Sequence, residues 1–229
     1  MKPRPNMIGV YLEIGRKRTF AAAMDWPGWC RSARDEVSAL ETLLHYGPRY
    51  AGVIAPARLG FRAPMDASQL CVTERLAGSA TTDFGAPAIA PSSDASPLDA
   101  AELERAQAIL KACWRAFDAA ARAAEGSELR KGPRGGGREL AGIIEHVLEA
   151  DAAYMSRLGR RFKRGEAGDA AEDLRRIREA ILDALRQTQS AEMPARGPRG
   201  GARWTPRYFV RRACWHVIDH AWEIEDRIT

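Results

Sequence analysis

The hydrophobic period of the chain changes near residue 95, and this change constrains the fold more than any other feature. Before it, apolar residues occupy alternate positions, as in Ile8–Ile14, which is the period of a half-buried strand. After it, apolar residues recur every three or four positions, the period of an amphipathic helix. We therefore predict an α+β chain, with a small αβ domain over residues 1–84 and a helical domain over residues 96–229.

The first domain is predicted to hold strands and one helix. Trp26-Pro27-Gly28-Trp29 is typical of a tight turn, and Gly47-Pro48 is expected to end a helix near residues 35–46. In that helix Val37, Leu40, Leu43 and Leu44 are expected to share the inward face. The predicted strands are Ile8–Ile14, its antiparallel partner Thr19–Met24, and the further candidates Val53–Ile54 and Leu70–Leu76.

The second domain is predicted to be a four-helix bundle. Residues 85–95 contain two prolines and no periodicity, so they are interpreted as a linker. Ser96-Pro97 and Thr205-Pro206 each combine an N-cap residue with a proline, which marks a helix start. The connections are longer than usual in bundles, so a simple up-down order is not assured. Apolar stripes define the four helices at residues 103–124, 140–158, 174–185 and from 206 to the C-terminus, with breaks at 132–137 and 190–203.

Composition excludes several classes of protein. No apolar run approaches the roughly 18 residues of a membrane helix, and no signal peptide is recognised, so no membrane partner is expected. The four cysteines lie far apart without a CxxC pair, which argues against a zinc ribbon or a disulfide scaffold. A cytoplasmic location is the expectation.

The net charge of +5 is not a strong signal for nucleic-acid binding. Arginine supplies 30 of the 35 basic residues, which codon bias in a GC-rich genome would also produce, and the basic excess is small in both halves. The local exception is residues 194–212, which hold six arginines and no acid. They could bind nucleic acid or a carboxylate, but a solvated surface is the favoured interpretation.

Two histidines four residues apart carry the strongest chemical signal. His216 and His220 share one arc of the last helix with apolar side chains, so both are expected to point into the bundle. At this spacing two imidazoles can bind one metal ion, although buried core histidines are the alternative. His146 is the candidate for a third ligand, and Asp151 for a substitute ligand or an acceptor behind the ligands. His45 is expected at the surface.

These residues resemble a known family. Residues 139–158, with Ile-Ile-Glu-His146-Val-Leu-Glu-Ala-Asp-Ala-Ala-Tyr, resemble the second helix of the DinB-like (YfiT-like) metalloenzyme superfamily. Residues 212–227, with Trp-His216-Val-Ile-Asp-His220-Ala-Trp, resemble its last helix. The resemblance covers residues 96–229 and implies a bundle holding a divalent metal through His146, His216 and His220. It also implies relatives that are S-transferases and isomerases using thiols such as mycothiol or bacillithiol.

A second resemblance concerns residues 7–60. A hairpin, the segment Trp-Pro27-Gly28-Trp-Cys and a helix starting at Asp35-Glu36 are similar to the HicB-like αβ fold. Antitoxin members of that family pair with a toxin ribonuclease, but no such partner follows from this sequence.

Two hypotheses for function result. The first is a metal-dependent enzyme, a thiol-dependent S-transferase acting on an electrophilic small molecule with zinc, nickel or iron. The alternative is a non-enzymatic regulatory protein, with the HicB-like module binding a partner and the bundle as a scaffold. A small-molecule substrate is expected, nucleic acid is not, and a homodimer is left open.

No residue is assigned a catalytic or cofactor-binding role. Asp219 and Glu223 fall outside the inward arc, which argues against a general base there. Tyr154 is either a hydrogen-bond donor at the site or a core tyrosine. Cys214 is interpreted as a core residue.

Overall fold

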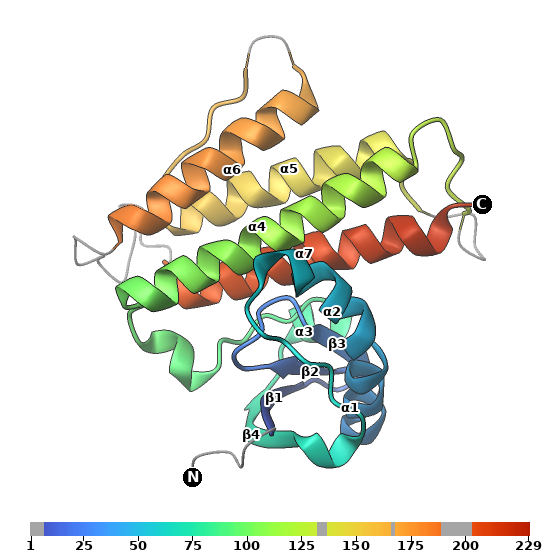
Figure 1. Ribbon diagram of the computed structural model, residues 1–229, viewed down its shortest axis with the longest axis vertical. Coiled ribbons are helices and arrows are strands. Elements are labelled where there is room, and N and C mark those ends of the chain that lie inside the picture. The colour runs from blue at the N-terminus through green and yellow to red at the C-terminus, as the bar shows by residue number, and fades with distance from the viewer. Residues whose placement is uncertain (1–6, 132–136, 166–167, 189–202) are drawn as a thin grey trace. The chain divides into compact units, whose positions relative to one another are not determined.

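The computed structural model describes residues 7–131, 137–165, 168–188 and 203–229. They group into two compact units, Met1–Ala95 and Ser96–Thr229. Within the described residues the chain has a four-stranded sheet, which lies in the first unit, and seven α-helices (Figure 1), so the predicted α+β class is confirmed. None of the helices described combines the length and apolarity needed to cross a membrane.

The sheet of the first unit has the strand order β3-β2-β1-β4. β2 pairs antiparallel with β1 and β3, whereas β4 runs parallel to β1. The predicted first two strands and the strand at residues 70–76 are confirmed. The short β3 was not predicted, because it has too few residues to show a period. The strands are β1 (Ile8–Ile14), β2 (Thr19–Ala23), β3 (Cys30–Ala33) and β4 (Leu70–Ala77).

β1 is not the half-buried strand that its alternation predicts. Its residues Val10–Glu13 are all buried, because the strand lies between β2 and β4 and both of its faces are covered. The buried Glu13 carboxylate accepts hydrogen bonds from the Thr82 hydroxyl and from the N–H groups of Ala88 and Ile89. Part of the predicted linker therefore contacts the sheet, and it also forms a 3-10 helix at Ser92–Ala95.

The helices of the first unit correct two predictions. α1 (Glu36–His45) begins after the N-cap Asp35 and ends before Gly47-Pro48 as expected. Val37, however, is 66% exposed and does not belong to its inward face. Val53–Ile54 is not a strand, because it forms the end of α2 (Gly47–Ile54), whose first turn accommodates the proline. A short helix, α3 (Ala80–Phe84), follows β4.

The second unit contains the four predicted helices. Thr205 caps the last helix as expected. The first begins later than Ser96, since Asp99 is its N-cap and forms a capping box with Glu102. The predicted breaks at residues 132–137 and 190–203 fall almost entirely outside the described residues. The helices are α4 (Ala100–Ala123), α5 (Leu140–Arg157), α6 (Ala170–Gln187) and α7 (Pro206–Arg227).

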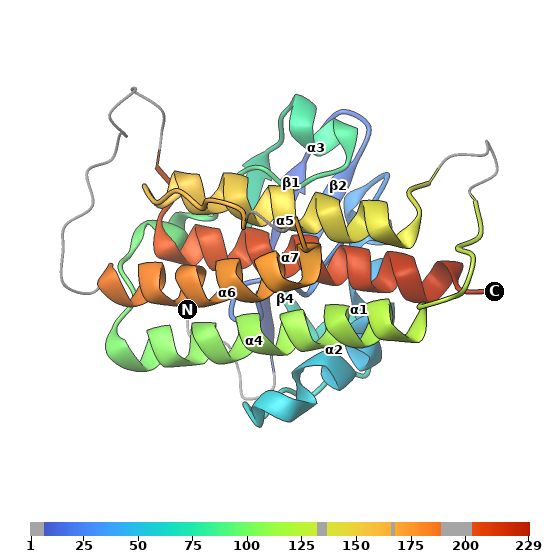
Figure 2. The ribbon, with the colours of Figure 1, turned by 90° about the horizontal axis from the view of Figure 1, so that it is seen from above.

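The bundle does not follow an up-down-up-down order (Figure 2). α4 and α7 run parallel, since Arg207 near the start of α7 bonds Glu102 near the start of α4, and Arg227 at its end bonds the Arg130 carbonyl that follows α4. α5 and α6 also run parallel to each other, so the connection between them must return along the length of α5. The order is therefore up-down-down-up, and α5 is antiparallel to α7.

Within the described part of residues 194–212, Arg207, Arg211 and Arg212 do not form the solvated surface that we predicted. Arg211 and Arg212 are only 8% and 9% exposed. Arg207 donates to the carbonyl oxygens of Ser96 and Pro97 and pairs with Glu102. These contacts bind the start of α7 to the start of α4. Arg196 and Arg199 lie outside the described residues.

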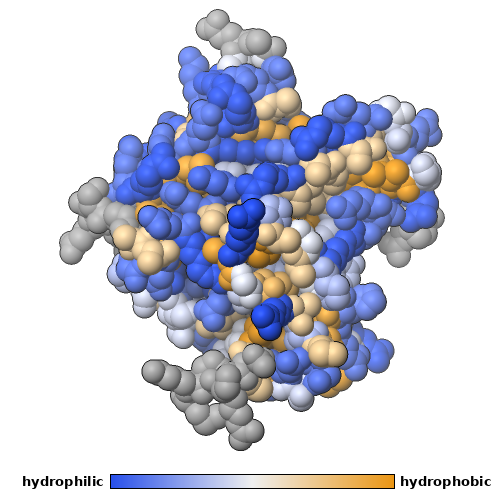
Figure 3. Space-filling view, viewed as in Figure 1, coloured by the Kyte–Doolittle hydropathy of each residue, from blue (hydrophilic) through white to orange (hydrophobic). Residues whose placement is uncertain are grey.

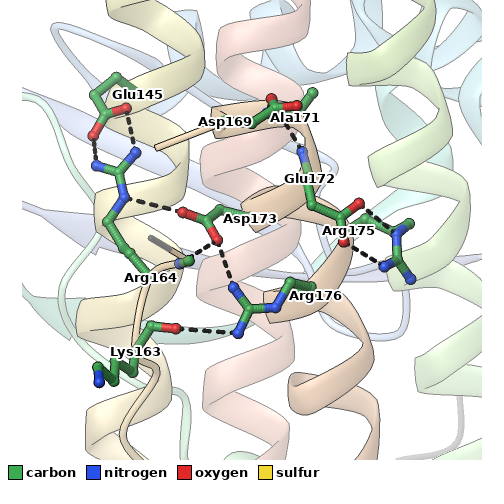
Figure 4. A network of polar contacts seen from close by, with 10 residues as sticks. Glu145, Lys163, Arg164, Asp169, Ala171, Glu172, Asp173, Arg175 and Arg176 are labelled. Atoms are coloured by element: carbon green, nitrogen blue, oxygen red, sulfur yellow. Dashed lines mark hydrogen bonds and ion pairs between the residues drawn. The ribbon is translucent and has the colours of Figure 1, made fainter. Parts of the chain in front are cut away.

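A polar network joins the start of α6 to the connection that precedes it (Figure 4). The Asp173 side chain, 2% exposed, accepts hydrogen bonds from the Gly165 N–H, Arg164 and Arg176. Arg164 also pairs with Glu145 of α5. On the face drawn in Figure 3, hydrophilic side chains alternate with hydrophobic patches.

We predict that Asp173→Asn destabilises the bundle in a pH-dependent manner. The Gly165 N–H, together with the two arginines, lowers the pKa of Asp173 below its ordinary value of 3.8. The stabilisation is therefore present above pH 3.8 and is lost as pH falls through the lower folded-state pKa. Urea unfolding should show a gap between wild type and variant at pH 6 that narrows below pH 4. Asp183→Asn, which breaks the exposed pair with Arg186, should change stability little; an equal loss in both variants would contradict the prediction.

Candidate metal centre

Three histidine side chains meet between α5 and α7. His146 comes from α5, while His216 and His220 come from α7. One nitrogen of each ring lies within 4.8 Å of the corresponding nitrogens of the other two. The antiparallel packing of the two helices creates this meeting, because it places the first half of α5 beside the second half of α7.

The spacing of the three rings suits a shared cation. The Nε2 atoms of His216 and His146 are 3.2 Å apart, and the ring centroids are 4.6–5.0 Å apart. Two nitrogens bound tetrahedrally to zinc at about 2.0–2.1 Å are separated by about 3.3 Å. The separation seen here therefore matches one edge of a coordination polyhedron.

The polar contacts of the rings involve Nδ1 in His220 and Nε2 in His216. The Nδ1 of His220 lies 2.8 Å from a carboxylate oxygen of Glu223, an acceptor that fixes the proton on Nδ1. The lone pair of His220 is then on Nε2. The Nδ1 of His216 is buried without a hydrogen-bond partner, and its Nε2 makes a polar contact with the Nε2 of His146.

The environment disfavours the charged forms of two of the rings. Burial, followed by the neighbouring His220 and His146, lowers the pKa of His216 well below its ordinary value of 6.5. Burial also lowers the pKa of His146, with a further contribution from Arg138. Neutral imidazoles offer their lone pairs to a cation without first losing a proton.

Tyr154 and Arg212 form one wall of the site. The ring of Tyr154 lies 5.7 Å from that of His216, and its hydroxyl accepts a hydrogen bond of 3.2 Å from Arg212. The guanidinium of Arg212 also lies over the rings of Tyr154 and Trp215. Tyr154 is thus both hydrogen-bonded and adjacent to the cluster. Arg212 brings a positive charge one helical turn from His216.

Glu223 is the site residue that helical-arc reasoning missed. We placed it outside the inward arc and set it aside as a general base, yet it contacts His220 directly. Glu223 lies just beyond the edge of the arc, and from there its side chain reaches the Nδ1 of His220, which is only partly buried. The spacing His-x-x-Glu at the edge of an apolar stripe is the signal that could have found it.

Asp151 and Cys214 are not part of the cluster. Asp151 is 1% exposed, and its Oδ2 has no hydrogen-bond partner. Burial raises the pKa of Asp151 to about 7, although Arg178 acts in the opposite direction. Burial also raises the pKa of the Cys214 thiol, which lies against Cys113. Cys214 is thus a buried thiol rather than a reactive thiolate.

The comparisons with known proteins identify the family of the bundle. The family model of the DinB superfamily matches residues 109–224, slightly more than half of the chain and all three histidines. The chain belongs to the DinB superfamily. DinB domains are commonly metal-binding, so the histidine cluster lies in a domain of the appropriate kind. Searches of curated proteins and of solved structures found no match. The HicB-like resemblance of residues 7–60 stays a prediction.

We predict that Asp151→Asn removes a pH-dependent loss of stability. The carboxyl faces Arg178 of α6 and lies near Tyr154 of α5 and Cys214 of α7. Its folded-state pKa of about 7 exceeds the ordinary 3.8, so the protonated form is favoured by folding. This stabilisation is present below pH 3.8 and is lost as pH rises through 7.

Denaturant unfolding of both proteins at pH 5 and pH 8 would check this. The wild type should lose more stability than Asp151→Asn between the two values. Parallel changes in the two proteins would show that Asp151 does not titrate in this range.

Proposed function

We propose that the DinB bundle binds one divalent metal through His146, His216 and His220. The observation that supports this most directly is the convergence of their ring nitrogens, two of which are 3.2 Å apart. Close contact between imidazoles has a physical cost unless something between them accepts their lone pairs. A cation does this for all three rings at once, whereas a proton can join only two.

The donor set indicates which metals and what kind of site to expect. Three neutral imidazoles suit zinc, nickel and iron better than magnesium or calcium, which prefer oxygen ligands. Three protein ligands are the number typical of a catalytic zinc site, in which a further position stays open. When bound, such a metal would lower the pKa of a thiol or a water in the open position.

We further propose that the reaction is the transfer of a low-molecular-weight thiol to an electrophilic small molecule. The thiol loses its proton, its sulfur forms a bond to the electrophilic carbon, and the leaving group departs with its electron pair. Arg212 would attract an anionic group of either reactant, and Tyr154 would support that arginine. The resemblance to thiol-dependent relatives supports this assignment. We also propose a cytoplasmic location, where the described cysteines, none of which forms a disulfide, would stay reduced.

We predict that the purified protein, made without a histidine tag and reconstituted, retains about one equivalent of zinc, nickel or iron. His216→Ala and His220→Ala should each retain less than about a tenth of an equivalent after gel filtration, because two ligands hold a metal poorly. His45→Ala is the matched control, since His45 is exposed on α1 in the other unit. Elemental analysis measures all four proteins. Metal below a tenth of an equivalent in the reconstituted wild type would refute the site.

We also predict metal-dependent conjugation of a thiol. Bacillithiol and mycothiol would be tested with 1-chloro-2,4-dinitrobenzene, and the thioether product and released chloride would be quantified. The metal-loaded protein should turn over at least about ten times faster than the metal-free protein, because only the former generates thiolate at neutral pH. Equal rates with and without metal, in protein that does bind it, would exclude the transferase assignment and favour the regulatory alternative.

A further inference from the structure

The last turn of α7 connects the histidine cluster to the C-terminal end of the chain. Glu223 uses both carboxylate oxygens: one is 2.8 Å from Nδ1 of His220, and the other accepts from Nη1 of Arg227 at 2.6 Å. The three residues lie at intervals of three and four on one helix, so their side chains stack along one edge. Each therefore restrains the next.

Arg227 is fixed on all sides of its guanidinium group. Besides Glu223, its Nε donates to the carbonyl of Arg130 at 2.9 Å and its Nη2 donates to the carbonyl of Arg138 at 2.8 Å. Both carbonyls belong to the connection between α4 and α5. The Arg227 side chain is 14% exposed, so water competes poorly for these bonds.

Gly137 makes room for this arrangement. Its φ of +124° is one that other residues rarely adopt, and a Cβ there would lie 2.7 Å from Nη2 of Arg227. The backbones are joined as well, since the Arg130 N–H donates to the Arg227 carbonyl and Leu129 bridges Ile228. The connection and the chain end thus form a frame for the arginine.

Through Glu223, the contacts of Arg227 reach only one of the three histidines, His220. Among the described residues, His220 alone has a carboxylate on its outer nitrogen, whereas Nδ1 of His216 has no partner. A carboxylate that holds a histidine N–H fixes the ring orientation and makes the other nitrogen a stronger ligand. Loss of Glu223 would not be compensated by the other two rings.

We propose that Glu223 is a positioning residue for His220, and that Arg227, anchored to the α4–α5 connection, holds Glu223 in place and thereby sets the metal affinity of the site. This inference rests on the proposed metal function. It assigns a role to residues beyond the three ligands and to the connection between α4 and α5.

The test is metal affinity measured with Co²⁺ and Zn²⁺ by chelator competition, together with the visible absorption of the Co²⁺ protein. Glu223→Gln should lower affinity by about 10–100-fold, because the amide lacks the charge and can donate to Nδ1, which moves the proton to Nε2. Glu223→Asp, which keeps the charge, should recover part of the loss. Arg227→Met and Gly137→Ala should weaken binding in the same direction without altering either His220 or Glu223.

The matched control is Asp118→Asn. It breaks the Asp118–Arg178 pair, whose side chains are 36% and 12% exposed, against 31% and 14% for Glu223 and Arg227. Its Co²⁺ affinity and spectrum should equal those of the wild type even where its melting temperature falls.

The two proposals fail in different ways. A wild type that binds neither ion refutes the metal function itself. A wild type that binds, with Glu223→Gln binding equally well, overturns the positioning role alone. If Glu223→Gln fails to fold, Gly137→Ala decides, since unchanged Co²⁺ affinity and spectrum in that folded variant would also overturn the inference.

Discussion

The burial of α7 is the constraint on which the rest of the bundle depends. From Tyr208 to Ile218 every residue of this helix is buried, although the stretch includes two arginines and a histidine. Buried polar groups must find partners within the protein, since each one left without a partner costs about 1–3 kcal/mol. The contacts that define the site supply such partners. Arg212 contacts Tyr154, His216 contacts His146, and just beyond them His220 contacts Glu223.

The up-down-down-up order determines which of these partners α7 can have. Because α5 runs antiparallel to α7, His146 near the start of α5 lies beside His216 and His220 of α7. Further along α5, Tyr154 lies beside Arg212, which comes earlier in α7. A parallel pair of helices would match the histidines to different neighbours. The parallel start of α4 and α7 is held separately, by Arg207 and its acceptors. The order of the helices and the chemistry of the site are therefore consequences of the same packing.

The surroundings of the histidine cluster disfavour the protonated forms of two of its rings. Burial lowers the pKa values of His146 and His216, Arg138 acts in the same direction on both, and Arg212 adds to the effect on His216. The nearest acid in contact with the cluster, Glu223, is engaged by His220 and Arg227 rather than pointing at the centre. The donor atoms that the cluster offers are therefore ring nitrogens. Imidazole nitrogen suits borderline metals better than calcium or magnesium.

The sequence by itself determined the elements that local physics controls. The change of period located the sheet and the bundle, and Thr205-Pro206 located the start of α7. The i, i+4 spacing placed His216 and His220 on one face, because helical geometry is independent of context. The sequence did not predict β3, because this segment is too short to show a period. It did not predict α2 either, because Gly47-Pro48 can end one helix and also stand in the first turn of the next.

Only the tertiary structure decided which residues meet. Whether His146 faces the α7 pair depends on the direction and register of two helices separated by a long stretch of chain, and no local pattern encodes either. The burial of Arg211 and Arg212 reversed the expectation for charged residues because α7 is covered around most of its circumference. Glu223 became part of the site for the same reason: a position at the edge of one helix acquires its role from the side chains that packing brings to it.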